Sequence, residues 1–236
     1  MTKLQTGIKG FDKLVGGIES GSRTLLYGPS GTGKTIFAMQ FLWQGLQNGE
    51  TVSFDVMDKP FPRLRWYFKS FGWDIEPYED QKKFIGIQAF PHFHDYPTDP
   101  RVIYFSLADF EEMKRIDKYL SDYKVTRFAA GDFSEHMFSL YDLIENQTVE
   151  NWTVNWSYYD NMANIDICAA ASSADYPVTR ARELAFKTAN NIVFFRINEA
   201  KEPIRREMRI VKMEGESHPL EWLPFQITKN GIEFLD

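Results

Sequence analysis

Residues 28–35 combine three glycines with a lysine and two threonines: Gly28, Pro29, Ser30, Gly31, Thr32, Gly33, Lys34 and Thr35. Their order fits the pattern G-x-x-x-x-G-K-[ST]. The glycines let the backbone curl until successive N–H groups surround phosphate oxygens. In such a loop the lysine ammonium binds the β- and γ-phosphates, and the threonine hydroxyl ligates Mg²⁺. The segment therefore predicts a site for a nucleoside triphosphate and its metal.

Three aspartates are candidates for the carboxylates that a phosphate loop also needs. Asp132 follows a strand-like segment at 125–131 and is placed to support Mg²⁺, although a helix cap or turn would use the same residue type. Asp55 and Asp58 both lie at the end of a second strand-like segment, and either carboxylate could orient the attacking water. We favour Asp55, because Asp58 is also placed to cap the helix that the next two prolines begin. With Lys34, these aspartates form the predicted catalytic set.

The phosphate-binding segment lies between elements of the kind that its chemistry requires. The apolar run 23–27 predicts a buried strand, and apolar residues at i,i+4 spacing predict a helix from Lys34 to the Asn48-Gly49 stop. Strand-like and helix-like segments then alternate. The expected strands are 51–55, 84–90, 125–132 and 165–171, and the expected helices are 61–71, 134–145, 178–189 and one beginning at Ser106, with Asp109 as its capping partner.

The last 45 residues have a different pattern, with short strand-like runs at 192–198, 205–212, 220–228 and 232–235 and a tight Asn230-Gly231 turn. Alternating strand-like and helix-like segments, followed by strand-like segments alone, predict an α/β fold. We expect a mostly parallel central sheet flanked by helices and extended by C-terminal antiparallel strands. Because no linker or low-complexity tract divides the sequence, we expect a single domain over residues 1–236.

Composition excludes several classes of protein. The single cysteine, Cys168, excludes an intramolecular disulfide. The sequence contains no run of about 18 apolar residues, so no membrane-spanning helix is expected. The N-terminal segment is too highly charged for a secretory signal, so a cytoplasmic location is expected. The net charge of −6 disfavours nucleic acid as a partner of the whole surface. Residues 196–212 are the exception, with six basic and three acidic residues; they form either a solvated hairpin or a phosphate-binding surface.

Five segments together resemble the KaiC-like branch of the RecA-type P-loop ATPases: 6–18 (TGIKGFDKLVGGI), 28–35, 70–74 (SFGWD), 212–218 (KMEGESH) and 224–232 (PFQITKNGI). The resemblance covers residues 1–90 and 190–236, and one copy of the domain is present. It implies a RecA-like fold, ATP with Mg²⁺, and often a homo-oligomeric ring with ATP between subunits. Residues 28–35 would then hold the phosphates and Asp132 the metal, while Lys212 would reach the nucleotide of the next subunit.

Two departures from this family affect the expected activity. The family usually has a pair of glutamates where this sequence has either Asp55-Val56 or, in the other alignment, Asp58-Lys59. Glu214 stands where the family pattern has an arginine, whose charge would stabilise the reacting phosphate. We therefore expect ATP binding with slow Mg²⁺-dependent hydrolysis, the nucleotide state regulating assembly or partner contact. A non-hydrolysing nucleotide sensor or scaffold and a DNA-handling recombinase relative are the alternatives.

Overall fold

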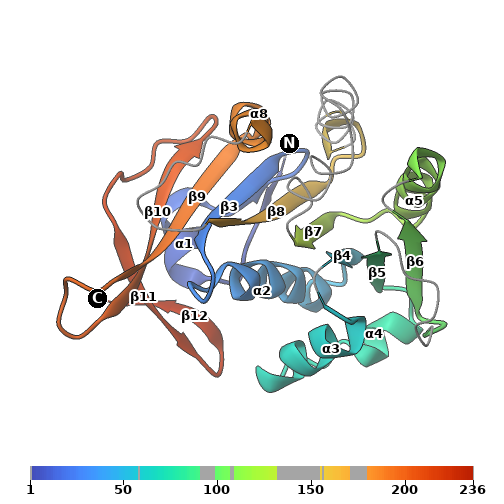
Figure 1. The fold of residues 1–236 in the computed structure, drawn as a ribbon, viewed down its shortest axis with the longest axis horizontal. Coiled ribbons are helices and arrows are strands. Elements are labelled where there is room, and N and C mark those ends of the chain that lie inside the picture. The colour runs from blue at the N-terminus through green and yellow to red at the C-terminus, as the bar shows by residue number, and fades with distance from the viewer. Residues whose placement is uncertain are drawn as a thin grey trace.

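A computed structural model describes residues 2–57, 59–90, 99–106, 109–131, 155, 157–170 and 180–235. Its centre is a ten-stranded sheet with the order β12-β11-β10-β9-β3-β8-β7-β4-β5-β6 (Figure 1). The parallel strands are β3 (Arg23–Pro29), β4 (Val52–Val56), β5 (Phe84–Phe90), β6 (Val102–Ser106), β7 (Arg127–Gly131), β8 (Ala163–Ala170) and β9 (Asn191–Asn198). The antiparallel extension is β10 (Arg205–Met213), β11 (Leu223–Thr228) and β12 (Gly231–Phe234). The predicted fold class is confirmed.

Helices cover both faces of the sheet (Figure 1). On one face lie α1 (Lys9–Val15), α2 (Lys34–Gln47), α3 (Phe61–Ser70) and α4 (Glu76–Asp80), and on the other lie α5 (Phe110–Asp122) and α8 (Arg180–Thr188). A separate two-stranded sheet joins β1 (Lys3–Leu4) to β2 (Ile18–Glu19). Among the helices that the structure describes, none is long and apolar enough to cross a membrane.

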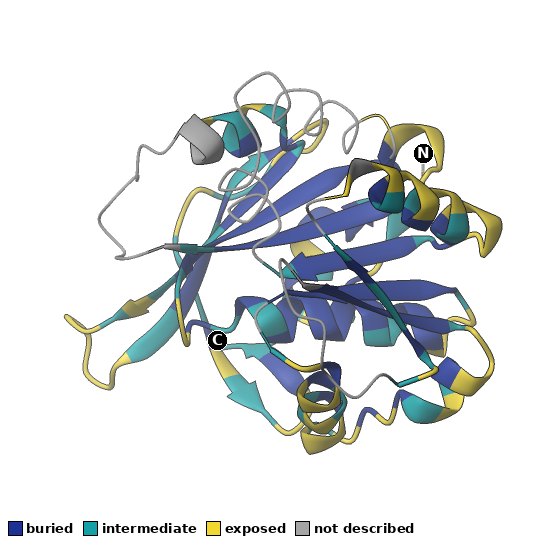
Figure 2. Ribbon diagram, turned by 45° about the vertical axis from the view of Figure 1, so that its right-hand side comes forward, coloured by how far each residue is buried: buried dark blue, intermediate teal, exposed yellow. Residues whose placement is uncertain are grey.

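The sheet divides the core into two layers (Figure 2). The central strands are buried, whereas β6 at one edge and the antiparallel extension at the other are partly exposed. Phe54 and Val56 of β4 belong to the layer under α2 and α3. Met57, which follows β4, belongs to the layer under α5, as does Ala130 of β7. Side chains alternate between the two faces along a strand, so every residue of β4 can be assigned to one of the two layers.

The prediction for the start of α5 was wrong. Ser106 does not cap this helix but ends β6, where it lies opposite Phe90 of β5. Asp109 is the N-cap, and its carboxylate accepts hydrogen bonds from the N–H groups of Glu111 and Glu112. The helix predicted over 134–145 lies outside the described residues.

Candidate functional site

The glycine-rich loop turns sharply between the end of β3 and the start of α2. Gly28 has a φ of 149°, and a Cβ there would lie 2.2 Å from the carbonyl oxygen of Phe195 in β9, so a larger residue would clash. Gly33 has a φ of 110° and is the N-cap of α2. The backbone therefore adopts the curled path that phosphate binding requires, and only glycine fits at its closest approach to the sheet.

The N-terminus of α2 is open to an anion. Its N-cap, Gly33, has no side chain to offer the first N–H groups, and its first turn contains no acidic residue. Such N–H groups lack an intrahelical partner, and the helix dipole adds positive potential at the same end. A fourteen-residue helix that begins in this way is a general phosphate-binding arrangement.

Lys34 lies against the loop that precedes it. Its side chain is buried, and its ammonium donates hydrogen bonds to the carbonyl oxygens of Gly28, at 2.6 Å, and Pro29, at 2.8 Å. The Thr32 hydroxyl also donates to the Pro29 carbonyl, at 2.8 Å. The two lysine bonds hold the ammonium against the carbonyl groups at the start of the loop, and the threonine bond closes the loop on Pro29.

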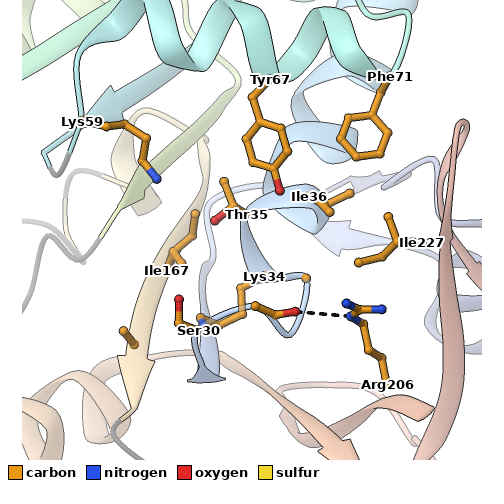
Figure 3. Close-up of a pocket in the computed structure, with 13 residues that line it drawn as sticks. Ser30, Lys34, Thr35, Ile36, Lys59, Tyr67, Phe71, Ile167, Arg206 and Ile227 are labelled. Atoms are coloured by element: carbon orange, nitrogen blue, oxygen red, sulfur yellow. Dashed lines mark hydrogen bonds between the residues drawn. The ribbon is translucent and has the colours of Figure 1, made fainter. Parts of the chain in front are cut away.

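A cavity of about 420 Å³ opens above the loop, within the range of about 300–1,000 Å³ typical of small-molecule sites (Figure 3). Ser30, Lys34 and Thr35 line its floor. Its lining includes Lys59 and Ile167 at one end, and Phe71, Ile227 and Arg206 at the other (Figure 3). The loop forms a polar floor, and the walls combine apolar side chains with the cations Lys59 and Arg206, which suits a ligand with a charged tail and a flat apolar part.

A second, smaller cavity of about 40 Å³ adjoins the first beside Thr35. The two share Lys59, Tyr67 and Ile167 as lining residues. Its wall also includes Gly131, the last residue of β7. The volume admits about one water molecule or ion next to the threonine hydroxyl. Asp132 follows Gly131 in the chain but, like Asp58, lies outside the described residues.

Asp55 is placed apart from these cavities. It lies inside β4 on the opposite face from Phe54 and Val56, and it lines neither cavity. Burial raises the pKa of Asp55 to about 7, and one hydrogen bond from the N–H of Ala89 opposes this effect. Within the described part of the chain its Oδ1 has no hydrogen-bond partner. The structure therefore does not bring Asp55 together with Lys34 and Thr35.

Two aromatic residues and an arginine at the cavity did not stand out as site residues from the sequence. Tyr67 and Phe71 are four residues apart, Tyr67 on α3 and Phe71 directly after it, and both line the larger cavity. Arg206 of β10 donates from Nε to the carbonyl oxygen of Gly31 at 3.3 Å, so it touches the phosphate loop itself. Burial raises the pKa of Tyr67, and the charge of Arg206 partly offsets this effect.

The other charges of the basic segment 196–212 are partly used within the sheet extension. Arg196 pairs with Glu207 at 2.7 Å and stacks on the Trp222 ring at 3.7 Å. Arg209 lies over the same ring at 4.9 Å. These contacts favour the hairpin interpretation of the segment over a continuous surface for nucleic acid.

Comparison with known proteins identifies the family. The family model described as "ATPase: KaiC" matches residues 4–137, more than half of the chain. The chain belongs to the KaiC ATPase family. It is 32% identical over 232 residues to the circadian clock protein KaiC3 of Synechocystis, an alignment that includes 98% of this chain but only 45% of that relative. It is also 27% identical to the UPF0273 protein PH0284 of Pyrococcus horikoshii, over 98% of this chain and 92% of that protein.

A solved structure supports the same fold. The KaiC-like protein PH0186 of Pyrococcus horikoshii superposes with a TM-score of 0.79 at 24% sequence identity, covering all of this chain and 99% of that one. The chain thus belongs to the KaiC-like branch of the RecA-type family and has the fold of that structure. The predicted resemblance is confirmed.

One departure from the KaiC family pattern has a clear structural consequence. Glu214, at the place of the family arginine, pairs with Lys212 at 2.8 Å and accepts a hydrogen bond from Asn190. Partial burial opposes ionisation of Glu214, but these hydrogen bonds outweigh it and lower its pKa. Lys212 also donates to the carbonyl oxygen of Ala189 at 2.6 Å. The lysine that the family resemblance assigns to the next subunit's nucleotide is therefore neutralised by its neighbour in this chain.

Proposed function

We propose that this chain binds ATP with Mg²⁺ in the larger cavity and hydrolyses it slowly, and that its nucleotide state regulates assembly or partner contact. The observation that carries this proposal is the uncapped N-terminus of α2 facing a cavity of about 420 Å³, with the buried Lys34 ammonium beside it. Family membership supports nucleotide binding as well.

Each part of the loop has a role in this proposal. The N–H groups of residues 28 and 30–35 and the Lys34 ammonium bind the phosphates, and Thr35 and Asp132 would hold Mg²⁺. Of these two, Thr35 lines the smaller cavity. Bound Mg²⁺ would neutralise charge on the β- and γ-phosphates. In hydrolysis a water oxygen bonds to the γ-phosphorus while the bond to the β–γ bridging oxygen breaks. ADP and inorganic phosphate are released, and the proton of the water passes to solvent.

The identity of the carboxylate that orients this water is also a proposal. Lys59, the residue that follows Asp58 in the sequence, lines both cavities. Asp55 lies in the opposite core layer, as the parity of β4 requires. We therefore assign the role to Asp58 ahead of Asp55.

Substituting Lys34 tests nucleotide binding. Lys34→Ala removes a charge-assisted contact of about 1.5–3 kcal/mol, so the dissociation constants for ATP and ADP are expected to rise roughly 10- to 100-fold in calorimetry. The matched control is Lys69→Ala, which removes an exposed lysine of α3 that does not line the cavity, and should leave both constants unchanged. Unchanged ATP affinity in folded Lys34→Ala would refute the proposal.

The ion pair between Lys212 and Glu214 favours one other function, a nucleotide sensor that does not hydrolyse, because it removes positive charge from an expected interface. Single-turnover measurement with Mg²⁺ and excess protein separates the two. For a slow ATPase we expect measurable release of phosphate that falls at least tenfold in Asp58→Asn and less than twofold in Asp55→Asn. Absence of phosphate release from the wild type would establish the sensor, and loss in Asp55→Asn alone would overturn our assignment of Asp58.

A further inference from the structure

Lys59 is a charged residue of the site to which the proposed function assigns no role. It lines the larger cavity and also the smaller one beside Thr35. Figure 3 shows its ammonium directed toward the cavity at the end near Ile167, with the loop between it and Arg206. The cavity thus has a cation at each end, and the two come from different segments of the chain.

The backbone that carries Lys59 is held in place by one buried side chain. Gln88 of β5, only 2% exposed, donates from Nε2 to the Lys59 carbonyl oxygen at 2.6 Å. Its Oε1 accepts a hydrogen bond from the N–H of Phe61 at 3.0 Å. Pro60 lies between these two contacts and is the N-cap of α3, with φ restricted by its ring. The amide of Gln88 therefore fixes the segment at two points around Pro60 and limits where the Lys59 side chain can reach.

The position of Lys59 indicates which phosphate of a bound nucleotide it would contact. Lys34 and the N-terminus of α2 serve the phosphates that lie on the loop. Thr35 marks the end where Mg²⁺ would bind, and Lys59 lines the wall of the same small cavity. In phosphate loops the metal ion held by the threonine bridges oxygens of the β- and γ-phosphates, so a cation beside Thr35 would lie on the side of the γ-phosphate. A diphosphate lacks this group, so a cation there discriminates between the two nucleotides.

We propose that Lys59, positioned by Gln88, binds the γ-phosphate and lets a single subunit distinguish ATP from ADP. This inference rests on the proposed function, because it concerns the same site. One alignment places Asp58-Lys59 where the family usually has two glutamates. In that alignment Lys59 replaces a negative charge with a positive one. The new cation belongs to the chain that holds the phosphate loop, whereas Lys212, expected to act on a neighbour, is paired with Glu214.

Calorimetry with Mg²⁺ and either ADP or a non-hydrolysable ATP analogue tests the inference without relying on activity. Lys59→Met is expected to raise the dissociation constant for the ATP analogue about tenfold and that for ADP less than twofold. Lys59→Arg keeps the charge and is expected to retain at least part of the preference for the analogue. Lys69→Met is the control from the exposed face of α3 and should match the wild type.

Gln88→Leu tests the positioning role. It is expected to weaken analogue binding selectively, and the double variant with Lys59→Met should be no worse than Lys59→Met alone, because both changes remove the same contact. An unchanged ratio of the two affinities in Lys59→Met, or an equal loss for both nucleotides, would overturn the inference while leaving nucleotide binding intact. Absence of binding of either nucleotide by the wild type would instead reject the proposed function.

Discussion

Arg127→Leu is expected to lower the free energy of unfolding by about 3–5 kcal/mol. Arg127 is fully buried in β7 and donates to both carboxylate oxygens of Glu50, each at 2.7 Å. It also donates to the carbonyl oxygens of Gln5 and Phe41 and stacks on the Phe41 ring at 4.6 Å. Leucine would leave the Glu50 carboxylate and two carbonyl groups without these partners, and an uncompensated buried charge is strongly destabilising.

Urea denaturation measures this loss. The matched control is Lys118→Leu, which breaks the exposed pair of Lys118 with Asp122 on α5 and is expected to change stability by less than about 0.5 kcal/mol. Adding Glu50→Leu to Arg127→Leu should restore part of the loss, because the unpaired carboxylate is then removed as well. A loss below about 1 kcal/mol in Arg127→Leu would contradict the central role of this residue.

Asp55→Asn is expected to gain stability relative to the wild type as the pH rises. Burial raises the pKa of Asp55 to about 7 in the native state, whereas the unfolded chain has a pKa near 3.8. Below about pH 4 the carboxyl is protonated in both states and imposes no penalty. Between about pH 4 and pH 7 the unfolded state loses the proton and the native state keeps it, so the wild type is progressively destabilised. Above pH 7 both states are ionised and the penalty becomes constant.

The expected size follows from about 1.36 kcal/mol for each pH unit. From pH 5 to pH 8 the stability of Asp55→Asn relative to the wild type should rise by roughly 2–3 kcal/mol, as measured by denaturant unfolding at several pH values. Asp80→Asn changes an exposed aspartate at the end of α4 and serves as the control, with no such rise. A difference for Asp55→Asn that stays constant over this range would show that its carboxyl is ionised throughout.

The phosphate loop and the order of elements could be predicted because each depends on a local pattern. Residues 28–35 contain their own turn chemistry, and periodicity distinguishes β3 from the following α2. The start of α5 was mistaken because Ser106 and Asp109 are both good capping residues. The choice between them depends on the pairing of Ser106 with Phe90 in β5, which no local pattern contains.

The rest of the site depends on segments that are distant in sequence. Lys59 and Tyr67 belong to the segment that enters and forms α3, whereas Arg206 lies far along the chain on β10. They line one cavity only because β10 folds back beside the loop. The spacing of Tyr67 and Phe71 was the one local signal for this wall. The placement of Asp55 was within reach of the sequence, since Phe54 packs under α2 and a strand reverses its face at every residue.

The hydrogen bond from Arg206 to Gly31 ties the antiparallel extension to the loop. A ligand that moves the Gly31 peptide toward the cavity would lengthen this hydrogen bond. A partner protein or second subunit that tilts β10 would displace the same peptide. Because coupling between two binding events is reciprocal, occupancy of the nucleotide cavity and engagement of the extension would alter each other's affinity through this contact.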